Sequence, residues 1–233
     1  MKIDIWFDLV CPFCYLGRHR FEAALAGFEH RDEVDVRWHS YELDRQAPAV
    51  ATDSLPEHLS AKYGMPLADA EAAQERLARD FEEYDLVFNW REARRGNTFD
   101  AHRLVHLAQD QGVGTAVVER LMRGYFSEGE AIGDRDTLVK LAVDAGLDEP
   151  AVRAAFDSDE LGSRVRTDEA LAGQIGVQGV PFFVFDERLG LSGAQPPSVF
   201  TQALTQAWDT KDESREYAGG GCGGDCCGGA CGS

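Results

Sequence analysis

The amino-acid sequence predicts an α/β fold in which strand-bearing segments stand at both ends of the chain and an all-helical domain is inserted between them. Three observations support this prediction: alternating apolar and polar residues near the start, a long run of helical patterns in the middle, and an apolar strand pattern after that run. We expect one domain split between residues 1–49 and 173–210, a helical insertion domain over residues 50–172, and a flexible tail over residues 211–233.

The start of the chain has the pattern of a strand, a helix and a second strand. Residues 3–7 and residues 34–39 alternate between apolar and polar side chains, which is typical of short strands. Between them, apolar residues recur at three- and four-residue steps from Arg18 to Phe28, which indicates a helix. Strand, helix and strand in this order favour a parallel crossover unit, which places Cys11 and Cys14 where the first strand ends and the helix begins.

Helical patterns fill the middle of the chain. Pro56 is expected to open a short helix that Gly64 closes. Asn97 or Thr98 is expected to cap another helix, with Asp100 helping to satisfy its first-turn amides. Further helices are predicted over residues 68–84, 116–126, 134–145 and 159–174.

Strand patterns return after the insertion. Residues 180–185 form an apolar run typical of a buried strand, and residues 189–191 are expected to pair with it across a turn. A last helix is predicted from Pro197 to Trp208. Residues 218–233 contain eight glycines, four cysteines and no large apolar side chain, so this segment cannot form a core.

Composition and charge limit the functions that remain. The formal net charge is −18, from 41 acidic and 23 basic residues, which argues against nucleic acid and anionic membranes as partners. No apolar run approaches the roughly 18 residues of a membrane span, and the start shows no secretory signal, so we expect a cytoplasmic protein. In that compartment six cysteines favour catalytic, redox-sensing or metal-binding roles over a structural disulfide framework.

Cys11, Pro12, Phe13 and Cys14 form the motif that says most about function. Two thiols spaced in this way at a helix start can form a disulfide with little strain, and the free amides of the helix terminus favour a thiolate at Cys11. We expect Cys11 to attack a substrate disulfide and Cys14 to resolve the mixed disulfide, while Pro12 sets the first helical turn. This redox chemistry needs no organic cofactor.

The same spacing also suits half of a zinc site. A zinc site needs a second cysteine pair or suitably spaced histidines nearby, and residues 1–217 contain no other cysteine. Together with the strand-to-helix position, this favours redox chemistry over metal binding.

Several segments together resemble a known family. They are the opening strand and the stretches Cys11-Pro12-Phe13-Cys14-Tyr15-Leu16-Gly17, Asn97-Thr98-Phe99-Asp100-Ala101-His102-Arg103, Gly176-Val177-Gln178-Gly179-Val180-Pro181-Phe182-Phe183-Val184 and Ser192-Gly193-Ala194-Gln195-Pro196. Over about residues 1–208 the chain resembles the DsbA-like thioredoxin proteins of the FrnE type. The resemblance implies a thioredoxin fold interrupted by a helical domain that closes over the active site.

The resemblance also assigns a role to Pro181. It implies that the Val180–Pro181 bond is cis, that Pro181 faces the cysteine pair, and that the backbone of Val180 pairs with an extended substrate peptide. A proline that only begins an edge strand is the alternative.

Phe13 bears on the direction of the reaction. The resemblance implies that strongly oxidising members carry a histidine between the cysteines, which Phe13 replaces here. Because phenylalanine cannot stabilise a thiolate, we expect a less oxidising disulfide, suited to a protein disulfide reductase or isomerase. Its partners would be protein or small-molecule thiols and disulfides, with glutathione a candidate electron donor and Phe13 supplying apolar contacts.

Other functions remain open. A segment like residues 97–103 also occurs in 2-hydroxychromene-2-carboxylate isomerases and kappa-class glutathione transferases, so His102 and Arg103 mark the superfamily or simply dock their helix. One alternative is a glutathione-dependent isomerase or transferase, although such relatives usually carry serine at the position of Cys11 and lack the second thiol. Another is a non-enzymatic holdase or metal-binding protein. The substrate and the oligomeric state stay open.

The tail cysteines are Cys222, Cys226, Cys227 and Cys231. They suit a second redox site that exchanges with the main pair, a zinc or copper(I) ligand set, or a mobile segment with no dedicated task. Because the surrounding glycines allow almost any geometry, the spacing does not decide between these hypotheses.

Overall fold

A mixed four-stranded sheet forms the centre of the computed structural model, which describes residues 1–219 and the side chains of residues 1–210. The strands are β1 (Lys2–Phe7), β2 (Asp35–Ser40), β3 (Phe182–Phe185) and β4 (Leu189–Ser192), in the order β2-β1-β3-β4. β1 is parallel to β2 and antiparallel to β3, which is antiparallel to β4. The predicted crossover unit and the late hairpin are therefore confirmed.

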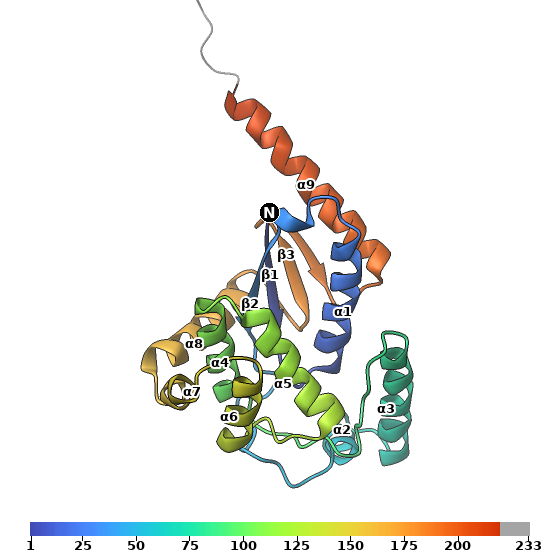
Figure 1. Ribbon diagram of the computed structural model, residues 1–233. Helices are drawn as coiled ribbons and strands as arrows, with labels where there is room; N and C mark the ends of the chain where they lie inside the picture. Colours follow the sequence, from blue (N-terminus) through green and yellow to red (C-terminus); the bar gives the residue numbers. More distant parts are fainter. Residues whose placement is uncertain (220–233) are drawn as a thin grey trace, which may run out of the picture.

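Helices cover both faces of this sheet (Figure 1). On one face lie α1 (Pro12–Ala26) and α9 (Pro197–Gly219), whose Phe21 and Phe200 meet the Phe183 ring of β3. On the other face, α8 (Asp159–Gln174) packs on β2, and the indole N–H of Trp6 donates to the Asp168 carbonyl at 3.0 Å. Because each face is covered, β1 is buried over nearly its whole length.

Between β2 and α8 the chain forms only helices and loops within the described residues. These helices are α2 (Leu55–Tyr63), α3 (Leu67–Glu82), α4 (Phe99–Asp110), α5 (Gly114–Glu128), α6 (Arg135–Asp144) and α7 (Glu149–Ala155), and a 3-10 turn (Arg31–Glu33) precedes β2. α2 and α3 pair as a hairpin, and α3 contacts α5 through the rings of Phe81 and Phe126. In Figure 1 α2 lies near the lower end of α5. The predicted α/β fold with a helical insertion is confirmed.

Several predicted boundaries differ from the structure. α1 begins at Pro12, which provides the backbone angle of the first helical turn as predicted, but it ends at Ala26, before the predicted Phe28. The sequence analysis missed α7, a short helix whose start is capped by the Asp148 side chain. The last helix continues past Trp208 to Gly219.

The predicted cap of α4 is confirmed in part. Thr98 is the N-cap residue, but its side chain makes no cap hydrogen bond, and Asn97 Oδ1 instead accepts the Phe99 N–H at 2.9 Å. The Asp100 carboxylate binds Arg103 and Arg135 instead of the first-turn amides.

Two contacts join the helical insertion to the sheet domain near the start of α1. Glu119 of α5 accepts a hydrogen bond from the Tyr15 hydroxyl at 2.9 Å and pairs with Arg18, so α5 lies against α1. The loop after β2 is joined to the segment before α4, because the Asn97 N–H donates to the Pro48 carbonyl oxygen and the Ala51 N–H donates to the Arg95 carbonyl oxygen.

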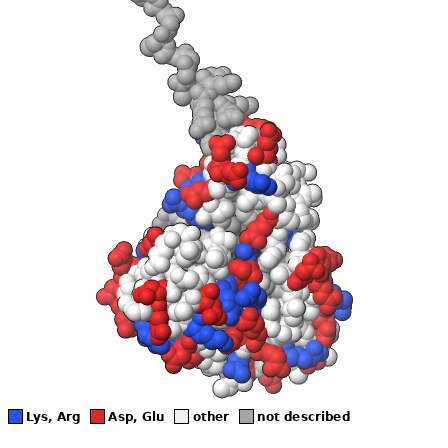
Figure 2. All heavy atoms as spheres, in the orientation of Figure 1, with Lys and Arg blue, Asp and Glu red and all other residues white. Residues whose placement is uncertain are grey.

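Charge is spread over the visible surface. Acidic side chains cover much of the face in Figure 2, with basic side chains among them. This distribution agrees with the formal net charge of −18.

Candidate functional site

The cysteine motif lies where the sequence predicts it, at the junction of β1 and α1. Cys11 is the N-cap residue of α1, with extended backbone angles of φ −85° and ψ 112°. Its carbonyl accepts the N–H groups of Cys14 and Tyr15, at 3.0 and 3.3 Å. Pro12 occupies the first turn. Cys11 therefore stands at the helix terminus, where free amides favour a negative charge.

The residues of the motif differ in exposure. Cys11 and Cys14 are 4% and 2% exposed, whereas Phe13 between them is 52% exposed. Both cysteines are thiols in this structure. Burial raises the pKa of the Cys14 thiol well above its usual value, and the neighbouring Cys11 adds to this effect. A hydrogen bond with the Asp8 backbone lowers this pKa, whereas the charge of the Asp8 carboxylate raises it. Cys14 is therefore held in the neutral form.

Pro181 comes to the motif from the other end of the chain. The Val180–Pro181 peptide bond is cis, as predicted. The Cys11 thiol donates to the carbonyl oxygen of Val180 at 3.6 Å. Gly17 of α1 packs so closely on this turn that an added Cβ would lie 3.0 Å from Pro181 Cγ. The structure thus brings Val180 and Pro181 against the cysteine motif.

Asp8 is a site residue that the sequence analysis missed. It is 1% exposed, and its Oδ2 accepts the Leu43 N–H at 2.8 Å. Its Oδ1 lies 3.4 Å from Nε2 of His102, which is 0% exposed. Within the described residues, Asp8 Oδ1 and both ring nitrogens of His102 make no hydrogen bond. The sequence offered one signal for Asp8, namely an acidic residue at the end of a strand pattern and three positions before Cys11.

His102 and Arg103 have different surroundings. His102 packs its ring against Phe7 and faces Asp8, so it belongs to the surroundings of the cysteine pair. Arg103 pairs with Asp100 at 2.7 Å and stacks on Phe99, so it fits the predicted docking role.

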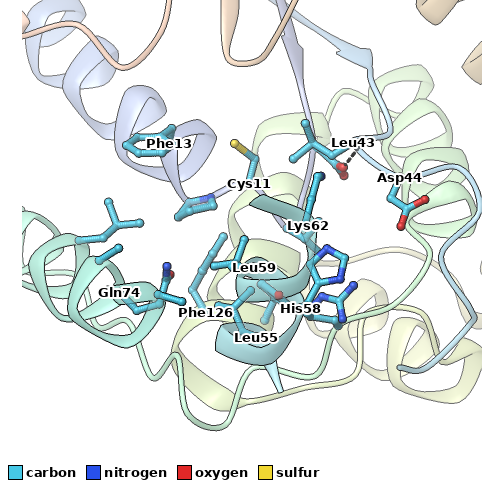
Figure 3. A pocket seen from close by; sticks show the side chains of 18 of the residues that line it. Cys11, Phe13, Leu43, Asp44, Leu55, His58, Leu59, Lys62, Gln74 and Phe126 are labelled. Atoms are coloured by element: carbon cyan, nitrogen blue, oxygen red, sulfur yellow. Dashed lines mark hydrogen bonds between the residues drawn. The ribbon is translucent and has the colours of Figure 1, made fainter. Parts of the chain in front are cut away.

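A cavity of about 600 Å³ opens beside Cys11. In Figure 3 the Cys11 sulfur lies at one side of it and Phe13 beside the sulfur, with α2 and α3 opposite. The lining is largely apolar and includes Leu55, Leu59 and Phe126. Asp8 also borders the cavity, so the buried carboxylate and the Cys11 thiol share it.

A second cavity, of about 990 Å³, lies at the outer edge of β2. It borders a polar network in which His39 bridges Asp4 and Asp168, at 2.7 and 2.8 Å. Burial alone would lower the pKa of His39, but the two carboxylates raise it to about 9. Asp168 also accepts the Ser40 N–H at 2.8 Å. This charged network joins α8 to β1 and β2.

No group of three or more His, Cys, Asp or Glu side chains within the described residues is placed to hold a metal ion. The described helices include none that is long and apolar enough to span a membrane. Cys222, Cys226, Cys227 and Cys231 lie outside the described residues, and the three hypotheses for them stay open.

Comparison with known proteins gives one family over most of the chain. The model of the DSBA-like thioredoxin domain matches residues 2–205. The solved structure of a probable DsbA oxidoreductase from Streptomyces coelicolor is 44% identical, with a TM-score of 0.85 and 90% of both chains covered.

More distant structures share the fold. A cytosolic disulfide reductase, DsbM from Pseudomonas aeruginosa, is 21% identical with a TM-score of 0.59, over 92% of this chain and 100% of that one. A 2-hydroxychromene-2-carboxylate isomerase is 16% identical with a TM-score of 0.58, over 94% of this chain and 98% of that one.

Proposed function

Because this chain belongs to the family of DsbA-like thioredoxin domains, we propose that it is a thiol–disulfide oxidoreductase of the reductase or isomerase type, working through Cys11 and Cys14. The observation that carries the proposal is the arrangement of the two thiols. Cys11 stands at a helix N-terminus beside a cavity and the cis Pro181, with the more deeply buried Cys14 one turn behind it.

The first step forms a mixed disulfide. The Cys11 thiolate attacks one sulfur of the substrate disulfide, a new S–S bond forms, and the second substrate sulfur leaves as a thiolate that takes up a proton. Cys14 then loses its proton and attacks the Cys11 sulfur, which releases the remaining substrate thiolate and leaves a Cys11–Cys14 disulfide. Two electrons pass from the dithiol to the substrate, and an external thiol donor, for which glutathione is a candidate, restores the dithiol.

The second step requires a proton acceptor for Cys14. Since burial raises the pKa of this thiol, Cys14 stays protonated until the mixed disulfide has formed. Asp8 lies close enough for its charge to act on Cys14, and its Oδ1 makes no hydrogen bond within the described residues. We assign Asp8 the role of accepting this proton, with the Leu43 N–H holding the other carboxylate oxygen.

Phe13 supports the reductase or isomerase direction. Its exposed ring carries no charge or hydrogen-bond donor for the Cys11 thiolate, so the reduced form gains little extra stability. We expect a reduction potential more negative than the roughly −120 mV of a dedicated oxidant. Equilibration of Cys11 and Cys14 with a glutathione buffer measures it, and a value near −120 mV would contradict this direction.

This direction suits a reducing compartment, so we extend the proposal to the cytoplasm. The cytosolic disulfide reductase DsbM has the same fold, which agrees with this extension.

An insulin-reduction assay tests the activity. The wild type is compared with Cys11→Ser, Cys14→Ser and a form that lacks residues 220–233. We expect Cys11→Ser to abolish turnover, Cys14→Ser to trap a mixed disulfide, and the shortened form to keep the activity. If the wild type accelerates reduction no more than Cys11→Ser does, the proposed function is wrong.

The same variants separate the alternatives. A hydroxychromene-carboxylate isomerase has the same fold, so one alternative is a glutathione-dependent isomerase. Such an enzyme would retain activity on a small aromatic acid after Cys14→Ser. A holdase or a metal-binding protein would retain its function after Cys11→Ser.

A further inference from the structure

The helix α2 presents part of its apolar side to the cavity beside Cys11, although Leu55 also packs against the core. Of its residues only Pro56 is buried, and Leu55 and Leu59 point into the cavity (Figure 3). Tyr63, at the end of the helix, also lines the cavity and is 62% exposed. Amphipathic helices normally cover their apolar side with protein, so a bound molecule would complete the packing of α2.

Gln74 supplies a second sign of a ligand on the opposite wall. It lies on α3, lines the cavity and is only 6% exposed. Its side-chain amide makes no hydrogen bond within the described residues, so its polar atoms are open to the cavity. A polar group of a bound molecule would provide a hydrogen-bond partner.

Lys62 is one of three basic residues that line the cavity, together with Arg76 and Arg95. Its side chain runs from α2 toward the side where Cys11 lies (Figure 3). No carboxylate of the described residues lies within 4.0 Å of its ammonium group, whereas Lys2 and Lys140 each pair with an acid. Lys62 is therefore available to an external carboxylate.

The other charged groups around the cavity have partners or lie on its rim. Arg95 binds Asp53 at 2.8 Å, and the Asp8 carboxylate faces His102. Burial and the Arg95 guanidinium lower the pKa of His58, which keeps that ring neutral. Asp44, Arg76 and Asp80 are exposed, and the opposite charges of Arg76 and Asp80 lie one turn apart on α3.

We propose that this cavity binds a low-molecular-weight disulfide that has an apolar body and a carboxylate, with its sulfur at Cys11 and its carboxylate at Lys62. This inference rests on the proposed function and names a substrate class for it. The cavity volume of about 600 Å³ falls in the range of small-molecule sites. Cys11 is only 4% exposed, which favours a narrow substrate over the disulfide of a folded protein.

Two aromatic disulfides test the role of the carboxylate. 5,5′-Dithiobis(2-nitrobenzoate) carries a carboxylate on each ring, and 4,4′-dithiodipyridine is uncharged at neutral pH. With the pre-reduced full-length protein, Cys11 forms a mixed disulfide and Cys14 releases the second aryl thiolate, so one disulfide is reduced to two coloured thiolates without an added reductant. The rate found for Cys11→Ser is subtracted, because it contains the reaction of every other thiol.

The informative variant is Lys62→Met, and Lys140→Met is its control because it removes the same charge from a surface pair with Glu130. We expect Lys62→Met to slow the dinitrobenzoate reaction about fivefold at low substrate concentration and to leave the dithiodipyridine reaction unchanged. Lys140→Met should change neither. Equal effects of Lys62→Met on both probes, or no effect, would overturn the inference. A wild type no faster than Cys11→Ser with either probe would instead overturn the proposed function.

Binding without reaction gives an independent test. 5-(Methylthio)-2-nitrobenzoate has no disulfide, and calorimetry measures its Kd for the wild type, Lys62→Met and Gln74→Leu. We expect both variants to bind more weakly, while Gln74→Leu keeps or raises the Tm because its amide has no protein partner to lose. A lower Tm with unchanged binding would show that Gln74 is structural and would contradict the proposed site.

Discussion

At the scale of single residues, the carboxylate of Asp8 lies behind the cysteine pair, where its charge opposes a thiolate at Cys14. Asp8→Asn should therefore lower the pKa of Cys14, which nevertheless stays raised because burial is the larger cause. The same change removes the proposed proton acceptor, so resolution of the mixed disulfide should slow at neutral pH.

The pH dependence of Cys14 alkylation, followed by peptide mass spectrometry in a Cys11→Ser background, measures the first effect. Asp44→Asn is a matched control, since Asp44 borders the same cavity but is exposed. If Cys14 alkylation has the same pH dependence with Asp8 and with Asp8→Asn, the charge of Asp8 does not act on Cys14.

His39 makes the stability of the fold depend on pH. Its pKa rises from 6.5 to about 9 in the folded protein because Asp4 and Asp168 bind its ring. The stabilisation is complete below pH 6.5 and is lost as the pH rises through 9, because the folded state then releases a proton that the unfolded state has already lost.

The free energy of unfolding in urea should thus fall between pH 7 and 10 by on the order of 2 to 3 kcal/mol more in the wild type than in His39→Gln. His30→Gln serves as the control, since His30 is only partly buried and lies outside this network. Parallel pH curves for the wild type and His39→Gln would contradict this prediction.

At the scale of elements, the outer edge of β2 is closed by a side chain. The Trp38 N–H donates to Gln109 Oε1 at 2.8 Å, and Gln109 Nε2 donates to the Trp38 carbonyl at 3.0 Å. The amide of α4 therefore forms the hydrogen bonds that a neighbouring strand would form.

Gln109→Ala should lower the free energy of unfolding by about 1–3 kcal/mol, since it leaves two backbone groups of an edge strand without these bonds. Gln111→Ala, at the exposed end of the same helix, is the matched control. Chemical denaturation measures the free energy of unfolding of the two variants. Equal values would mean that water replaces the Gln109 hydrogen bonds without loss of stability, which would contradict the prediction.

The elements also show what local patterns can and cannot predict. The site of Cys11 and Cys14 was predictable, because a strand pattern, two thiols and a helix pattern follow one another directly in the chain. The short helix α7 was missed because its seven residues carry too little periodicity.

At the scale of the whole molecule, the features that escaped prediction are contacts between distant segments. Asp8 and His102 meet only because α4 folds back on the end of β1, and no local pattern encodes that approach. The cavity between Cys11 and the α2–α3 hairpin depends in the same way on tertiary packing. The cis Val180–Pro181 bond was expected from a family resemblance rather than from base rates, which favour trans.

The pairing of β1 with β3 has a consequence for synthesis of the protein. β1 and the cysteine motif leave the ribosome before β3, which completes the sheet beside them and is translated on the order of ten seconds later. During that interval the fold that buries both thiols is incomplete. The nascent chain is therefore open to disulfide exchange at both cysteines, whereas in the folded protein we propose this exchange only at the cavity beside Cys11.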